Sequence, residues 1–142
     1  MPYPSEIFVD AVKAGWVAGG VAGAQVDKSI SNSQYFCGRL SSYTSSQGAY
    51  LEREHGDILT PGTWDLDIFC PINALGGTTE VALDGVSLGS YSQYNASSSR
   101  TLVTISGIAI SETSRYLLRF TNIAGGAGVA YVFISGYTWR KQ

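Results

Sequence analysis

Residues 63 to 69 alternate between polar and apolar side chains with a period of two. Trp64, Leu66 and Ile68 share one side of an extended backbone, and Thr63, Asp65 and Asp67 share the other. This period predicts a β-strand with one face in a core and one in solvent, because successive side chains of a strand point to opposite faces. A chain built around such strands must bury each apolar face against a second layer.

Turn signals separate this strand from other short apolar runs. Asp84-Gly85 predicts a type I′ hairpin, because that turn needs positive φ at both central residues. The apolar phase changes across Gly107, which predicts a β-bulge. Val129–Trp139 is apolar on both faces, which predicts a strand that is central or covered by another subunit. Short strands at spacings of about ten residues predict an all-β fold, an antiparallel jelly-roll-like β-sandwich over residues 31–142.

The first part of the chain follows a different pattern. Ser5 is a candidate N-cap, and Ile7, Phe8, Ala11 and Val12 recur at helical spacing. We therefore expect a short helix to about Gly15, or an extended arm, within residues 1–30. The segment Tyr35–Leu40 predicts a short strand, and the serine-rich Ser41–Gly48 predicts a loop.

The N-terminal segment also carries an apolar series that the predicted sandwich does not use. Its members are Ile7, Phe8, Val12, Trp16, Val17 and Val21. Because a monomer rarely leaves a large apolar patch exposed, we expect this series to pack against a neighbouring subunit or an underlying capsid or tail protein. The alternative is that the sandwich covers it within one subunit.

Charge excludes some classes of partner. The net charge is -2 and the pI about 5.2, so the chain has no basic field for nucleic acid. Asp10 and Lys13 interrupt the apolar stretch near the start, which argues against membrane insertion, and no export signal is expected there. Charged residues make up only 14% of the chain, which is common among secreted, virion and oligomeric β proteins.

Metal and redox chemistry find little support in the sequence. Cys37, Cys70 and the single His55 cannot complete a tetrahedral zinc site, so we expect no cofactor and no metal. Both cysteines are interpreted as small buried hydrophobes, with a disulfide as the alternative. Asp65 and Asp67 would lie about 7 Å apart on one strand face. That spacing could suit paired glycosidase carboxylates or a calcium ion, but a solvated strand face is the simpler interpretation.

Two further groups of side chains are candidates for function. His55 stands among charged residues with no G-x-S-x-G elbow in the chain, so we expect an exposed strand end or a salt-bridged subunit contact, no catalytic residue and no enzyme. Aromatic side chains near strand ends could stack on sugar rings, or could belong to the core or an interface. These glycan-binding candidates are Tyr91, Tyr94, Tyr137 and Trp139.

A resemblance extends these expectations. Pro61–Ile68, the hairpin Val81–Val86, the strand Tyr116–Phe120 and the aromatic closing strand resemble jelly-roll modules of phage structural proteins and of galactose-binding-type carbohydrate-binding modules. The resemblance implies a jelly roll, often trimeric, that decorates a virion or binds a glycan. The sequence thus predicts a non-enzymatic phage accessory protein, a homotrimer on the capsid or tail of a virion assembled in the host cytoplasm. The alternatives are a lectin-like glycan-binding module and a carbohydrate-active enzyme.

Overall fold

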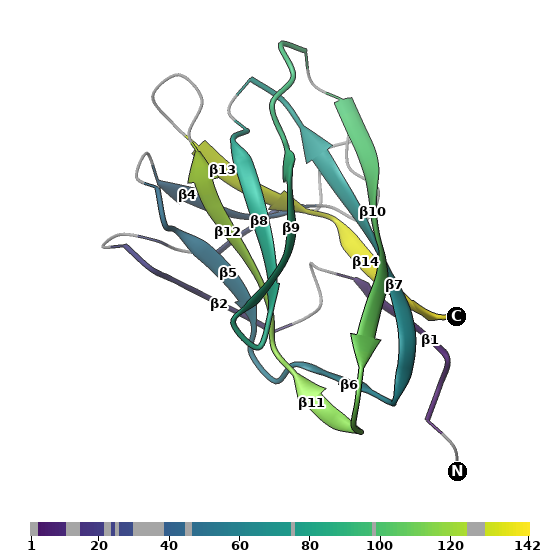
Figure 1. Ribbon diagram of the computed structural model, residues 1–142. Helices are drawn as coiled ribbons and strands as arrows, with labels where there is room; N and C mark the ends of the chain where they lie inside the picture. The colour runs from purple at the N-terminus through teal and green to yellow at the C-terminus, as the bar shows by residue number, and fades with distance from the viewer. Residues whose placement is uncertain are drawn as a thin grey trace.

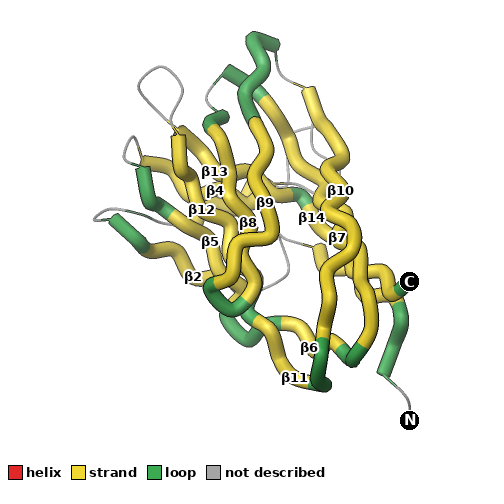
Figure 2. Tube along the Cα trace, in the orientation of Figure 1, coloured by secondary structure: helices red, strands yellow, loops and turns green. Residues whose placement is uncertain are grey.

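The computed structural model describes residues 3–10, 15–21, 24, 26–29, 39–44, 47–74, 76–97, 99–124 and 130–142. Across these ranges the chain forms strands and loops, and Figure 2 shows no helix in them. The described residues accordingly include no helix long and apolar enough to cross a membrane. The predicted all-β class is confirmed.

Two antiparallel sheets form the body of the sandwich (Figure 1). The four-stranded sheet has the order β1 (Glu6–Asp10), β14 (Gly136–Lys141), β7 (Gly62–Ile72) and β10 (Ser99–Ile110). The five-stranded sheet has the order β2 (Trp16–Gly19), β5 (Tyr50–Arg53), β12 (Leu118–Ala124), β8 (Thr78–Leu83) and β9 (Val86–Ser92). Two smaller sheets pair β13 (Ala130–Ile134) with β4 (Arg39–Thr44) and β3 (Val26–Ser29), and β11 (Ser114–Tyr116) with β6 (Asp57–Leu59).

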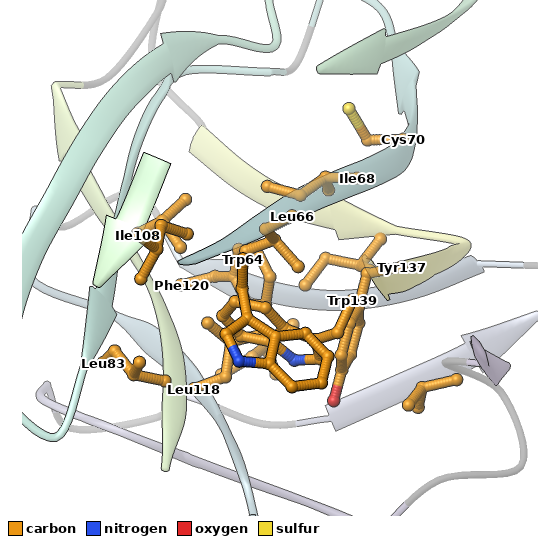
Figure 3. Close-up of a cluster of buried hydrophobic side chains, with 14 of the residues drawn as sticks. Trp64, Leu66, Ile68, Cys70, Leu83, Ile108, Leu118, Phe120, Tyr137 and Trp139 are labelled. Atoms are coloured by element: carbon orange, nitrogen blue, oxygen red, sulfur yellow. The ribbon is translucent and has the colours of Figure 1, made fainter. Parts of the chain in front are cut away.

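The core lies between the two large sheets. Trp64, Leu66 and Ile68 of β7 are fully buried, as their alternation predicts. Leu118 and Phe120 approach them from β12, and Tyr137 and Trp139 from β14, as Figure 3 shows. The predicted bulge is confirmed, because the register of β10 against β7 shifts between Ile105 and Ile108, and Gly107 has a φ of 74°.

The predicted closing run is interrupted by Ser135, which separates β13 from β14. Val132, Phe133 and Ile134 of β13 are all fully buried, which confirms a strand with no solvated face. Strand β14 lies between β1 and β7, so it is central in its sheet.

The hairpin between β8 and β9 turns at Asp84-Gly85, as predicted. Both residues have positive φ, 47° and 82°. The Asp84 amide donates to the Leu117 carbonyl (2.9 Å), and the Leu117 amide donates to Asp84 Oδ1 (2.7 Å), so the turn is tied to the start of β12. Val86 directly follows the turn at the edge of the sheet and is 67% exposed, whereas Val81 and Leu83 of β8 are buried.

Gly85→Val should lower the free energy of unfolding by about 1–2 kcal/mol, because a β-branched side chain resists the left-handed region. A Cβ at Gly85 would meet nothing within 4 Å, so the loss isolates the backbone conformation. Thermal unfolding measures it, with Gly85→Asn as the control, because asparagine tolerates positive φ. Equal melting temperatures for the valine variant and the parent protein would contradict the turn assignment.

The structure corrects two expectations in the first part of the chain. The predicted helix is wrong over Glu6–Asp10, because these residues pair with β14 as strand β1. Pairing to a central strand satisfies their backbone groups, which outweighs a weak helical spacing. The predicted loop Ser41–Gly48 is wrong up to Thr44, because β4 continues to that residue between β3 and β13.

The N-terminal apolar series divides between the core and the surface. Trp16 is buried in the core, and Ile7 packs against the core cluster. The sandwich therefore covers Trp16 and Ile7 within one subunit. Phe8 and Val17 are 56% and 45% exposed, and Val21 is half-buried. The interface role of the exposed members stays a prediction. Val12 and the expected domain boundary near residue 30 lie outside the described residues.

Candidate functional site

The predicted aromatic platform does not form. Tyr137 and Trp139 are fully buried, because they occupy the inward-facing positions of β14. The Tyr91 hydroxyl is also buried. Tyr94 alone of the four is well exposed, at 55%, so the prediction is wrong for a shared surface.

A buried polar cluster explains why Tyr137 and Trp139 belong to the core. The Tyr137 hydroxyl donates to Asp57 Oδ2 at 2.5 Å, and Trp139 Nε1 donates to the same oxygen at 3.3 Å. Arg53 pairs with Asp57 Oδ1 at 3.4 Å, and its Nε donates to the Tyr137 hydroxyl at 2.9 Å. Burial, reinforced by the Asp57 carboxylate, raises the pKa of Tyr137 far above its usual range. The cluster joins the two sheets.

Asp65 and Asp67 are buried, so the predicted solvated face is wrong at these positions. Asp67 accepts from Thr104 Oγ1 (2.7 Å) and Arg140 Nε (2.6 Å), and the Arg140 bond is the main reason that its pKa is lowered. Asp65 accepts from the Gly107 amide (3.1 Å) and Gln142 Nε2 (2.6 Å). Because both carboxylates already accept hydrogen bonds from these donors, Asp65 and Asp67 do not fit a calcium site. The described residues hold no cluster of three His, Cys, Asp or Glu side chains suited to a metal.

His55 lies at the end of the sandwich near β6 and β11. It is exposed, as predicted, and its carbonyl accepts from Arg115 Nη1 at 3.2 Å. Together with Glu54, Arg115 and Leu117 it lines a wide, open hollow. These lining residues include one carboxylate, on Glu54, but no serine, threonine or cysteine, so the arrangement offers His55 no nucleophile to activate.

The outward face of the four-stranded sheet carries a different kind of surface. Gly136 of β14 is directly opposite Phe69 of β7, which is in turn opposite Leu102 of β10. Phe8 of β1 adds a ring on the far side of Gly136, where two of its carbons lie 3.5 Å from the position that a Cβ on Gly136 would take. We call Phe8, Gly136, Phe69 and Leu102 the outer strip. It crosses the four strands that lie side by side on the right of Figure 1.

The outer strip is accessible at Phe8 and Leu102, while Gly136 at its centre is buried. Phe8 is 56% exposed and Leu102 is 55% exposed, while Phe69 is half-buried. Gly136 keeps the centre of the strip free of a side chain. A Cβ there would lie 2.9 Å from the Val9 carbonyl oxygen and 3.5 Å from two carbons of the Phe8 ring. The Phe8 ring therefore lies open to a ligand at the β1 end of the strip.

A pocket of about 210 Å³ adjoins the strip at β10. Its lining residues are Phe69, Cys70, Arg100, Thr101, Leu102 and Ser135. Cys70 is buried and free, and burial raises the pKa of its thiol to about 12, so it is an inert hydrophobe, as predicted; Cys37 lies outside the described residues. The pocket is smaller than the ~300–1,000 Å³ typical of drug-sized sites, and it combines apolar walls with few polar groups.

Polar side chains flank the strip on the next row of the sheet. Thr138 of β14 and Thr104 of β10 both lie opposite Asp67 of β7. The Asp67 carboxylate is buried and already bonded to Thr104 and Arg140, so Thr138 and Thr104 are the members of this row that a ligand can reach. Arg140 binds Asp67 beside them and is itself partly exposed. The face thus places hydrogen-bonding groups next to apolar ones, which suits a ligand with both apolar faces and hydroxyl groups.

Sequence reasoning assigned Phe8 to an interface and overlooked Phe69 and Leu102. A signal was present, because Phe69 is an apolar residue in the polar phase of Thr63, Asp65 and Asp67. Leu102 likewise shares its phase with Thr104. An apolar side chain at an outward position of an amphipathic strand marks a surface that a ligand or partner can cover.

Of the comparisons with known proteins, the one with solved structures found proteins of similar fold. No protein-family model matches the chain, and no curated protein matches it significantly. Among solved structures, the CBM36-1 domain of a multidomain xylanase from the hindgut metagenome of Trinervitermes trinervoides is similar with a TM-score of 0.66 and 14% identity, over 96% of this chain and 98% of that one.

Two further structures extend this likeness. The carbohydrate-binding module CBM36 in complex with calcium and xylotriose has a TM-score of 0.54 and 14% identity, over 93% of this chain and 97% of that one. The K1 cleaved adhesin domain of Lys-gingipain from Porphyromonas gingivalis W83 has a TM-score of 0.68 and 8% identity, over 98% and 99%. At these identities the likeness shows the fold alone, and the chain has the jelly-roll sandwich of carbohydrate-binding modules.

Proposed function

We propose that this protein is a non-catalytic carbohydrate-binding module that holds its glycan against the outer strip. The observation that carries the proposal is the outer strip itself, with Phe8 exposed beside Gly136 and a small pocket at Leu102. The apolar face of a sugar ring stacks on an aromatic side chain, while its hydroxyl groups bond to the polar row next to the strip. The fold supports the same function, because solved structures of similar fold include a module in complex with xylotriose.

The phage accessory role expected from the sequence has less support than glycan binding. None of the three solved structures named above is described as a phage protein, so the virion location, the capsid or tail partner and the trimeric state stay predictions. The glycan-binding alternative takes precedence, because the exposed face has the mixed apolar and polar character that a sugar requires.

Phe8→Ala should weaken glycan binding about tenfold, because the ring loses the apolar area that a bound sugar would cover. Its free energy of unfolding should fall by less than about 1 kcal/mol, since 56% of Phe8 is already exposed. A polysaccharide panel, by affinity electrophoresis, first identifies a glycan that the parent protein binds. Calorimetry with that glycan then measures the loss for the variant.

Tyr94→Ala is the matched control, because Tyr94 is equally exposed but lies in the loop after β9. We expect it to bind like the parent protein. If Tyr94→Ala abolishes binding and Phe8→Ala leaves it intact, the glycan binds at the loops and the assignment to the outer strip is wrong. A parent protein that binds no member of the panel would overturn the function itself.

A further inference from the structure

The arginines of the described residues differ in how they are paired. Arg53 pairs with Asp57, Arg119 with Glu52 and Arg140 with Asp65 and Asp67. Arg115 donates to a backbone carbonyl. Arg100 is exposed, and within the part of the chain that the structure describes it has no carboxylate at ion-pair distance. A guanidinium without a partner is available to a ligand.

Arg100 occupies a specific place on the outward face. It is opposite Pro71 in the register of β10 against β7, two positions before Leu102, so its side chain emerges on the same face as the outer strip. Arg100 and Leu102 both line the pocket of about 210 Å³. None of the described residues that line this pocket is acidic. The pocket is therefore positively charged on a protein whose net charge is -2.

We propose that the Arg100 pocket selects glycans that carry a carboxylate, such as uronic acids, over neutral glycans. This inference rests on the proposed function and names the class of ligand for that same site. A planar guanidinium binds a carboxylate through two parallel N–H···O bonds, whereas it binds a single hydroxyl with one weaker bond.

A matched pair of polymers tests the charge of the ligand. Polygalacturonate and its fully methyl-esterified form share one backbone and differ in whether the carboxyl groups are charged. We expect the parent protein to bind the acidic form at least about tenfold more tightly. Arg100→Gln should remove that preference, and Arg100→Lys should retain only part of it, because an ammonium keeps the charge but not the two-pronged geometry.

Arg115→Gln is the control for general electrostatic attraction. It removes the same charge from β11, a strand that Figure 1 shows far from the start of β10. We expect this variant to keep the full preference for the acidic polymer. An equal effect of the Arg100 and Arg115 substitutions would mean that net charge alone attracts the polymer, and the inference would be wrong.

The outcomes also separate this inference from the proposed function. If the parent protein binds a neutral polysaccharide through Phe8 but does not prefer polygalacturonate to its ester, the outer strip stands and the selectivity assigned to Arg100 is overturned. If it binds no polysaccharide at all, both fail. Circular dichroism of each Arg100 variant should match the parent protein, since the side chain is exposed, so a loss of binding cannot come from unfolding.

Discussion

Trp64→Ala should lower the free energy of unfolding by about 3–5 kcal/mol, the range for removing a large aromatic side chain from a packed core. Trp64 is fully buried between the two large sheets, in contact with the cluster that Figure 3 draws. Its indole Nε1 also donates to the Thr60 carbonyl at 2.8 Å, so the alanine variant loses this bond as well as apolar contacts. Both losses act on the strand that pairs with β14 and β10.

Urea unfolding followed by circular dichroism measures this loss. Trp64→Phe keeps most of the apolar volume but loses the bond to Thr60, so we expect a smaller loss, about 1–2 kcal/mol. Val86→Ala, at a side chain that is 67% exposed in the hairpin, should change stability by less than about 0.5 kcal/mol. If Trp64→Ala lowers the free energy of unfolding no more than Val86→Ala does, then Trp64 does not anchor the core.

Asp57→Ala should lower the free energy of unfolding by about 3 kcal/mol, although it removes a charge from the interior. Asp57 is only 7% exposed and accepts from Tyr137, Trp139 and Arg53. Without it, the Arg53 guanidinium stays largely buried with its charge uncompensated, and two aromatic donors lose their acceptor. The penalty comes from the partners left behind more than from the lost ion pair itself.

A double variant separates the penalty of the partners left behind from the loss of the ion pair itself. Arg53→Met combined with Asp57→Ala removes both charges, so we expect it to be more stable than Asp57→Ala alone. Chemical denaturation of the parent protein, the two single variants and the double variant completes the cycle. If the two single losses simply add, the residues do not interact and the buried cluster does not join the sheets as described.

The site shows where sequence reasoning succeeds and where it fails. The strand phase of Tyr137 and Trp139 is readable from the sequence, but whether that phase faces solvent or a second sheet depends on Phe120 and Asp57, which are distant in the chain. The same limit applies to Asp65 and Asp67. Their alternation with Trp64 and Leu66 predicts an outward face correctly, yet Arg140, Gln142 and Thr104 cover that face in the folded chain.

The sequence by itself determined the local features of this protein: the alternation of β7, the type I′ turn at Asp84-Gly85 and the bulge at Gly107. Each depends on the intrinsic preferences of a few adjacent residues, which can be read without knowing any distant contact. Only the tertiary structure decided that Glu6–Asp10 is a strand and that Phe8 lies beside Gly136, which is opposite Phe69. The reason is that strand pairing joins residues more than a hundred positions apart, and no local pattern encodes which partner supplies the missing hydrogen bonds.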